Sequence, residues 1–152
     1  NIRTGGATMK KTMEHYKFVI NTGEKTDIHN ITEEVLSCVG KSNVSYGLCV
    51  VLVTHSTAGV ALNSIGDPNT RNDLQEEIDR LVPTRIDFKH QLDTERDASA
   101  HVKLFLVGNS VLIPIENGTL PLSVSSGVFL CEFDGPRTRT VTVQIWDGFE
   151  KA

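Results

Sequence analysis

The chain has 152 residues, of which 39% are hydrophobic and 22% are charged. These values are typical of a single globular domain large enough to bury a core. The net charge is −4 and the lysines and arginines are scattered, which argues against a general nucleic-acid or membrane-surface binder. No apolar stretch approaches the ~20 residues that span a bilayer.

The three cysteines, Cys38, Cys49 and Cys131, have no CxxC spacing, and each lies in an apolar run. We interpret them as buried reduced thiols, and an odd count without a signal peptide fits the cytoplasm. Residues 1–8 precede Met9 and carry no pattern. We interpret them as an expression remnant and expect residues 9–152 to form one domain.

The first half of the chain predicts strands separated by one helix. Residues 16–22 alternate in polarity and predict a strand, and Asp27 is expected to cap a helix over residues 28–40 that ends at Gly40. Residues 46–54 are nearly all apolar and predict a central strand covered on both faces. Residues 60–63 resume as a strand.

The next segment predicts two helices and a loop. Asp67 and Pro68 predict the start of a helix that Pro83 ends. Residues 84–97 are polar and without period, which indicates a long loop. Residues 98–107 predict a helix that ends at Gly108 and packs through one apolar face, formed by Ala98, Val102 and Phe105.

The C-terminal third predicts strands joined by turns. Residues 111–115 form a predicted strand, Asn117-Gly118 predicts a tight turn, and residues 130–133 and 139–146 predict a closing hairpin. The order of elements indicates an α+β two-layer domain with a mostly antiparallel sheet and helices on one face. The other face of that sheet needs cover, so we expect the subunits to associate.

The stretch from Glu132 to Arg137 carries more charge than a turn requires. Turn chemistry accounts for Asp134, Gly135 and Pro136, but not for Glu132 and Arg137. We therefore expect these last two side chains to serve a site.

Three histidines offer candidate chemistry upstream. His55 follows an apolar strand and precedes the hydroxyls of Ser56 and Thr57, His90 lies in the polar loop, and His101 is beside an apolar helical stripe. With an acid such as Glu132 they predict a divalent metal site. One alternative is an anion site in which Arg137 and Arg139 grip a phosphate while a histidine transfers protons. Another is that the histidines only satisfy buried hydrogen bonds.

Taken in order, these segments resemble the YjbQ-like family. The resemblance runs from about Tyr16 to Gln144 and is carried by His55-Ser-Thr-Ala-Gly-Val-Ala-Leu-Asn63, His90, Asp97-Ala-Ser-Ala-His101, Gly108-Asn-Ser110 and Glu132-Phe-Asp-Gly-Pro-Arg137. It implies a homotrimeric α+β domain with a polar pocket near a subunit boundary. It also implies a divalent metal, zinc or magnesium, at the histidines of some members. The implied activity is a weak thiamine-phosphate synthase reaction, in which pyrophosphate leaves.

By position, the family's site residues correspond to His55, His90, His101, Glu132 and Arg137, with Asn63, Asp73 and Ser110 in support. The chain departs from the family where Ser64 replaces a glutamate, around Asp97, and at Ser125-Ser126, where the family carries Trp-Gln.

We therefore expect a cytoplasmic, homotrimeric enzyme that acts on a small anionic or phosphorylated metabolite. We assign catalysis to His55, His101, Glu132 and Arg137, and a metal to His55, His90 and His101. Substrate contacts are assigned to Ser56, Thr57, Asn63, Ser110, Arg137 and Arg139. The alternative is a binding or sensing protein without turnover.

Overall fold

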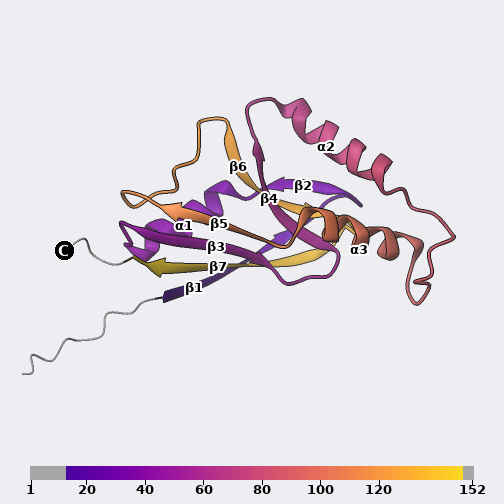
Figure 1. Cartoon of the computed structure of the whole chain (residues 1–152), viewed down its shortest axis with the longest axis horizontal. Coiled ribbons are helices and arrows are strands. Elements are labelled where there is room, and N and C mark those ends of the chain that lie inside the picture. The colour runs from indigo at the N-terminus through magenta and orange to yellow at the C-terminus, as the bar shows by residue number, and fades with distance from the viewer. Residues whose placement is uncertain (1–12, 149–152) are drawn as a thin grey trace, which may run out of the picture.

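The computed structural model describes residues 13–148, so the predicted remnant at residues 1–8 lies outside the described part. This part has an α+β fold with antiparallel sheets and three helices, as predicted (Figure 1). In chain order the elements are β1 (Met13–Asn21), β2 (Asp27–Asn30), α1 (Thr32–Ser42), β3 (Gly47–Val53), β4 (Ala58–Ser64), α2 (Pro68–Leu81), α3 (Glu95–Val107), β5 (Ser110–Ile115), β6 (Ser126–Glu132) and β7 (Thr138–Asp147).

The strands are divided between two sheets, of order β1-β7-β3-β5 and β2-β6-β4. The predicted hairpin of β6 and β7 is therefore wrong, because these strands belong to different sheets and residues 133–137 carry the chain from one to the other. Burial explains the separation. Val128 and Leu130 of β6 face the main core while Phe129 and Cys131 face a second apolar cluster, so β6 is covered on both faces.

The segment predicted as the first helix begins as a strand. Asp27–Asn30 pairs with β6, and the helix starts at Thr32, whose N–H donates to the Asn30 side chain at 3.0 Å. Ile28 matches the helical spacing of Val35 but packs in the second cluster, on the other side of the sheet. The helix also continues past Gly40 and is followed by Asn43 in the left-handed conformation.

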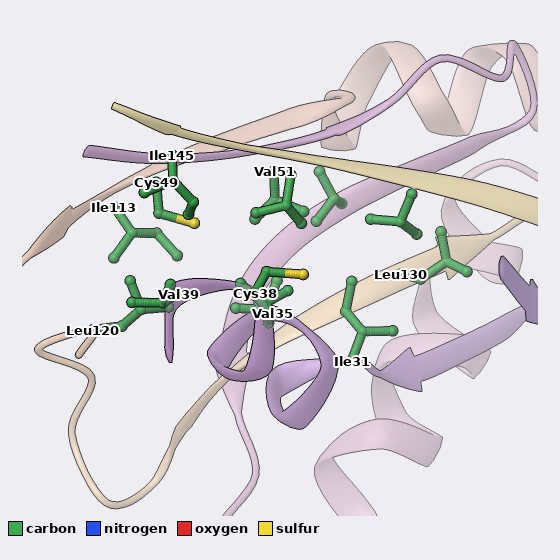
Figure 2. Packing of buried hydrophobic residues seen from close by; sticks show 14 of the residues in the cluster. Ile31, Val35, Cys38, Val39, Cys49, Val51, Ile113, Leu120, Leu130 and Ile145 are labelled. Atoms are coloured by element: carbon green, nitrogen blue, oxygen red, sulfur yellow. The ribbon is translucent and has the colours of Figure 1, made fainter. Parts of the chain in front are cut away.

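The main core lies between the two sheets and α1 (Figure 2). Val35, Cys38 and Val39 of α1 point toward inward side chains of β3, β5 and β7, including Cys49 and Ile145. Each fully buried aliphatic side chain contributes roughly 1.5–3 kcal/mol to folding. The three cysteines are free and buried.

The outer face of the four-stranded sheet is only partly covered within the chain. Cys49, Val51 and Val53 of β3 are buried, whereas Leu48 is exposed, so the prediction that β3 is covered on both faces is wrong for the isolated chain. Exposed Trp146 is the register partner of Leu48, and Leu112 of β5 is 62% exposed.

Helices α2 and α3 pack on the three-stranded sheet (Figure 1). Asp67 caps α2 by accepting from the Asn69 N–H at 2.8 Å, and Gly108 ends α3, both as predicted. The predicted apolar face of α3 is wrong, since Phe105 is 89% exposed while Lys103 is fully buried. No helix within residues 13–148 is both long and apolar enough to cross a membrane.

Candidate functional site

His90, Asp97 and His101 converge at the start of α3. One ligand atom from each lies within 4.8 Å of the others. His90 Nε2 is 2.8 Å from Asp97 Oδ2, and His101 Nε2 is 3.1 Å from the same oxygen. The two imidazole rings stand edge to face with centroids 5.3 Å apart. The loop and the helix thus present two nitrogens and one carboxylate, a set that zinc binds in catalytic sites.

The helix cap fixes the orientation of this cluster. The Thr94 side chain accepts from the Asp97 N–H at 3.2 Å, which places Asp97 in the first turn. His101 follows four residues later, so it projects from the same side of the helix. Burial raises the pKa of Asp97, but the hydrogen bonds and charges of His90 and His101 outweigh it, and the pKa lies below its usual range.

The two ring nitrogens of His101 face two different oxygen atoms. Nδ1 of His101 is 2.8 Å from the carbonyl oxygen of Ser56, which can only accept. Nε2 faces the carboxylate of Asp97, which also accepts when ionised. Each ring nitrogen thus faces an oxygen acceptor, and a metal ion on Nε2 in place of a proton would suit this arrangement. A hydrogen bond from Nδ1–H to the Ser56 carbonyl oxygen would leave Nε2 free to coordinate a metal.

His55 lies outside this cluster, in contrast to its predicted role as a metal ligand. Its Nε2 accepts from the Thr140 N–H at 3.0 Å, so that nitrogen has no lone pair left for a metal. Burial, followed by the charge of Arg139, lowers the pKa of His55 against the opposing effect of Glu132. The ring is thereby kept neutral, as its hydrogen bond requires.

Glu132 and Arg139 form a buried ion pair. Glu132 is fully buried, and its oxygens accept from Arg139 Nε at 2.7 Å and Arg139 Nη2 at 2.6 Å. Thr22 and the N–H groups of Phe133 and Asp134 also donate to it. Burial raises the pKa of Glu132, but the hydrogen bonds from Arg139 and from the Asp134 N–H outweigh this effect. The pKa of Glu132 therefore lies below its ordinary value. The geometry does not fit the predicted roles of Glu132 in catalysis and Arg139 in anion binding, because neither reaches solvent.

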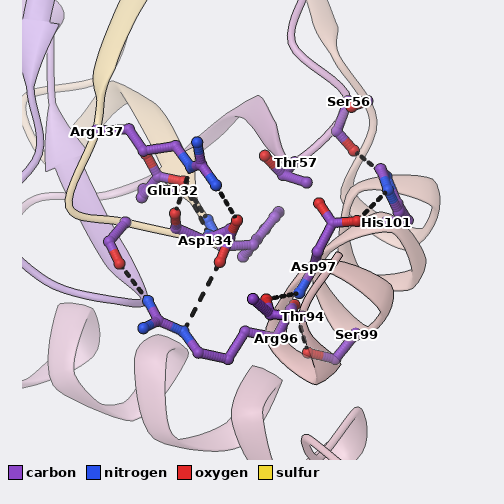
Figure 3. A network of polar contacts seen from close by, with 12 residues as sticks. Ser56, Thr57, Thr94, Arg96, Asp97, Ser99, His101, Glu132, Asp134 and Arg137 are labelled. Atoms are coloured by element: carbon purple, nitrogen blue, oxygen red, sulfur yellow. Dashed lines mark hydrogen bonds and ion pairs between the residues drawn. The ribbon is translucent and has the colours of Figure 1, made fainter. Parts of the chain in front are cut away.

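Asp134, predicted to serve only the turn, is a buried carboxylate between two arginines (Figure 3). Arg137 Nη2 donates to Asp134 Oδ2 at 2.6 Å, and Arg96 Nε is 3.7 Å from Oδ1. Arg96 Nε is buried and has no hydrogen-bond partner among the described residues. The Arg137 side chain is 51% exposed, so its charge can still face a ligand.

The side chain of Arg96 connects the corner at residues 134–137 to the histidine cluster. Arg96 also donates to the carbonyl oxygen of Gly135, and Arg96 is the chain neighbour of Asp97 in the histidine cluster. A Cβ at Gly135 would lie 2.1 Å from the carbonyl oxygen of Glu24, so only glycine fits there. The corner at residues 134–137 is thus tied to the first turn of α3.

The remaining predicted contacts are dispersed. Thr57 is buried and accepts from Arg139 Nη2 at 2.7 Å, while Ser56 contributes its carbonyl oxygen to His101. Asn63 lies toward the other end of β4, opposite Gly127. Ser110 and Asp73 are exposed and lie on β5 and α2. The structure does not bring these last three residues into the histidine cluster.

The sequence alone does not identify Asp97 as a candidate ligand, or Arg96 and Asp134 as an ion pair. The four-residue spacing of Asp97 and His101 on a helix was a local signal for the first. No local pattern signalled the second, because Arg96 and Asp134 are distant in the sequence.

Comparison with known proteins agrees with this fold. The sequence profile described as UPF0047 protein YjbQ-like matches residues 16–148. The UPF0047 protein of Archaeoglobus fulgidus is 36% identical over 84% of this chain and 98% of its own. UPF0047 protein YugU of Bacillus subtilis is 33% identical over 90% of this chain and 98% of its own.

Solved structures extend the likeness. A hypothetical protein from Aeropyrum pernix K1 superposes with a TM-score of 0.83 at 32% identity and covers 89% of this chain and 99% of its own. An uncharacterised protein of the YjbQ/UPF0047 family from Clostridium acetobutylicum gives 0.81 at 38% identity, over 86% of this chain and 98% of its own. The chain belongs to the YjbQ-like UPF0047 family.

Proposed function

We propose that this protein is an enzyme that uses a divalent metal ion to act on a small anionic or phosphorylated metabolite. The observation that carries the proposal is the convergence of His90, Asp97 and His101, whose ligand atoms lie within 4.8 Å of one another. Two nitrogens and one carboxylate leave coordination positions for water or substrate. A bound metal would supply Lewis acidity and neutralise charge on an anion.

Arg137 supports the anionic class of substrate. Its guanidinium is anchored by Asp134 and half-exposed, and Arg96 links that corner to the metal ligands. If the substrate is a diphosphate, as in thiamine-phosphate synthase chemistry, Arg137 would stabilise the departing pyrophosphate. In this proposal Asp97 replaces His55 as the third ligand, and His101 keeps its orientation through the Ser56 carbonyl oxygen.

Association of subunits belongs to the same proposal. Leu48, Leu112 and Trp146 are exposed on the outer face of the four-stranded sheet, a surface that a second copy would cover. We propose a homotrimer, which sedimentation equilibrium tests directly. A single-chain mass at micromolar concentration would contradict it. The buried free cysteines support a cytoplasmic location.

Turnover by metal-depleted protein, with and without zinc or magnesium, tests the enzymatic proposal. We expect a panel of phosphorylated metabolites, including the thiamine-phosphate synthase substrates, to yield product only with metal. His101→Ala should abolish turnover, whereas His29→Ala, on β2, should not. Metal-independent turnover, or full activity of His101→Ala, would refute the proposal.

A binding or sensing protein is the second candidate. The observation that favours it is the saturation of Glu132, whose carboxylate accepts five hydrogen bonds and cannot serve as a base. Tight binding of metal and anion without any product would favour this candidate over the enzyme.

A further inference from the structure

A small cavity lies between α2 and the three-stranded sheet, away from the histidine cluster. Its volume is about 110 Å³. Ala61, Phe129 and Cys131 of the sheet form its floor, and Leu74 and Ile78 of α2 form its roof. None of the residues that line it is charged, and Asn63 is the one that carries an amide.

The chemistry of these walls disfavours water and ions. A buried water needs two to four polar partners, and Asn63 offers few, since its Oδ1 already accepts from the Ser64 N–H at 2.7 Å. Burial raises the pKa of the Cys131 thiol to about 12, so the floor carries no thiolate. Apolar cavities of roughly 150 Å³ bind small hydrocarbons such as benzene, and this one is somewhat smaller.

Polar contacts explain why α2 does not close the cavity. No residue of this helix is buried. Arg71 pairs with Asp27 at 2.9 Å, and Gln75 donates to the Thr26 carbonyl oxygen at 3.0 Å. Further along the helix, Asp79 accepts from Thr26 at 2.8 Å and pairs with the buried Lys103 of α3.

These contacts hold the helix at a fixed height above the sheet. Leu74 and Ile78 therefore cannot settle into the gap without breaking an ion pair. A ligand that filled the cavity would recover the dispersion contacts that the lining side chains lack.

We propose that this cavity is a binding site for a small apolar group, either an aromatic ring or a short branched alkyl group. Asn63, which is exposed and lines the cavity, contacts a polar substituent at the mouth. A phenol-like molecule, with an apolar body and one hydroxyl, fits both features. The site is independent of the metal cluster and of the function proposed for it.

Methyl-resolved NMR with benzene as the probe tests the site. We expect saturable shifts confined to residues that line the cavity, including Ala61, Leu74 and Ile78. Ala61→Leu should fill the cavity, abolish the shifts and raise the melting temperature. If Ala61→Leu does not fold, the smaller change Ala61→Val should still weaken benzene binding. Leu62→Met, the adjacent position on β4, should bind benzene as the wild type does.

Three results would overturn the proposal: no saturable shift in the wild type, undiminished binding by both Ala61 variants, or equal loss in Leu62→Met. The first result would identify the cavity as a packing void only.

Phenol tests the role of Asn63. Asn63→Ala should weaken phenol binding by roughly fivefold, the effect of one hydrogen bond, and leave benzene binding unchanged. Equal weakening of both would overturn the polar contact.

Discussion

The histidine cluster and the Glu132–Arg139 pair are two charged groups near the same corner of the fold, yet they differ in burial and in hydrogen bonding. Glu132 is fully buried, and both its oxygens have donors from Arg139 as well as from Thr22 or backbone N–H groups. The histidine side chains are about two-fifths exposed, and His101 faces acceptors on both ring nitrogens. The first group has its charges paired within the chain, whereas the second is a candidate site for a cation.

The contrast teaches that charge at a strand end does not by itself mark a functional residue. A buried carboxylate must find donors from the chain, because an unpaired one is too costly to retain. A carboxylate that faces only histidines can exchange their protons for a metal. The saturation of hydrogen bonds therefore separates a structural acid from a candidate ligand.

The largest expected effect is on stability, from Glu132→Gln. The substitution removes a buried charge and leaves Arg139 without a counter-ion, which should lower the free energy of unfolding by about 3–5 kcal/mol. Urea denaturation monitored by circular dichroism measures the loss. Zinc affinity of the folded fraction should be unchanged.

The double variant Glu132→Gln with Arg139→Met is the matched control. Removing both charges abolishes the unpaired cation, so the double variant should be more stable than Glu132→Gln alone. A single variant as stable as the wild type would mean that the pair does not support the fold.

Asp97→Asn should show the opposite pattern, with a large loss of metal binding and little loss of stability. The amide cannot supply the negative charge that attracts the ion, and we expect zinc affinity to fall at least ~100-fold by calorimetry. The Thr94 cap uses the Asp97 backbone N–H and survives the change. Asp73→Asn, at an exposed acid of α2, is the control, and unchanged affinity in Asp97→Asn would exclude the site.

The sequence predicts the fold well where the pattern is local. Strand alternation and the caps at Asp67 and Gly108 predict the elements to within a few residues. The assignment of β2 to a helix and the closing hairpin fail for a different reason. Both depend on which core a residue joins, and two apolar clusters on opposite faces of one sheet cannot be distinguished by periodicity alone.

The site is predictable only in part, since hydrogen bonding decides the role of each residue. His90 and His101 come together, but His55 instead accepts the Thr140 N–H, a contact made across the fold. Lys103 lies in an apolar helical stretch of the sequence and is buried against Asp79. Such long-range pairs leave no local signal.

A smaller effect is expected from Arg137→Ala. Its half-exposed guanidinium is the part of the corner that can meet an anion, so inorganic pyrophosphate should bind the metal-loaded protein about tenfold more weakly. Isothermal titration calorimetry measures the affinity. Lys17→Ala, which removes an exposed charge from β1, controls for net charge, and an equal loss in both variants would argue against a specific anion contact.

The smallest effect concerns the pH dependence of stability at His55. Its pKa lies below the ordinary value of 6.5, chiefly through burial and then through Arg139. The unfolded chain therefore binds this proton at a higher pH than the folded chain does. The stabilisation from neutral His55 is complete above about pH 6.5, declines as the pH falls toward the lowered folded pKa, and then levels off.

His55→Gln keeps an acceptor for the Thr140 N–H and removes the titration. The wild type should therefore lose more stability than the variant between about pH 7.5 and 5.5. Urea denaturation at the two pH values measures the difference. Parallel losses would mean that His55 takes up its proton equally in both states, and the contrast between a neutral structural histidine and the candidate metal-binding pair would then have no support.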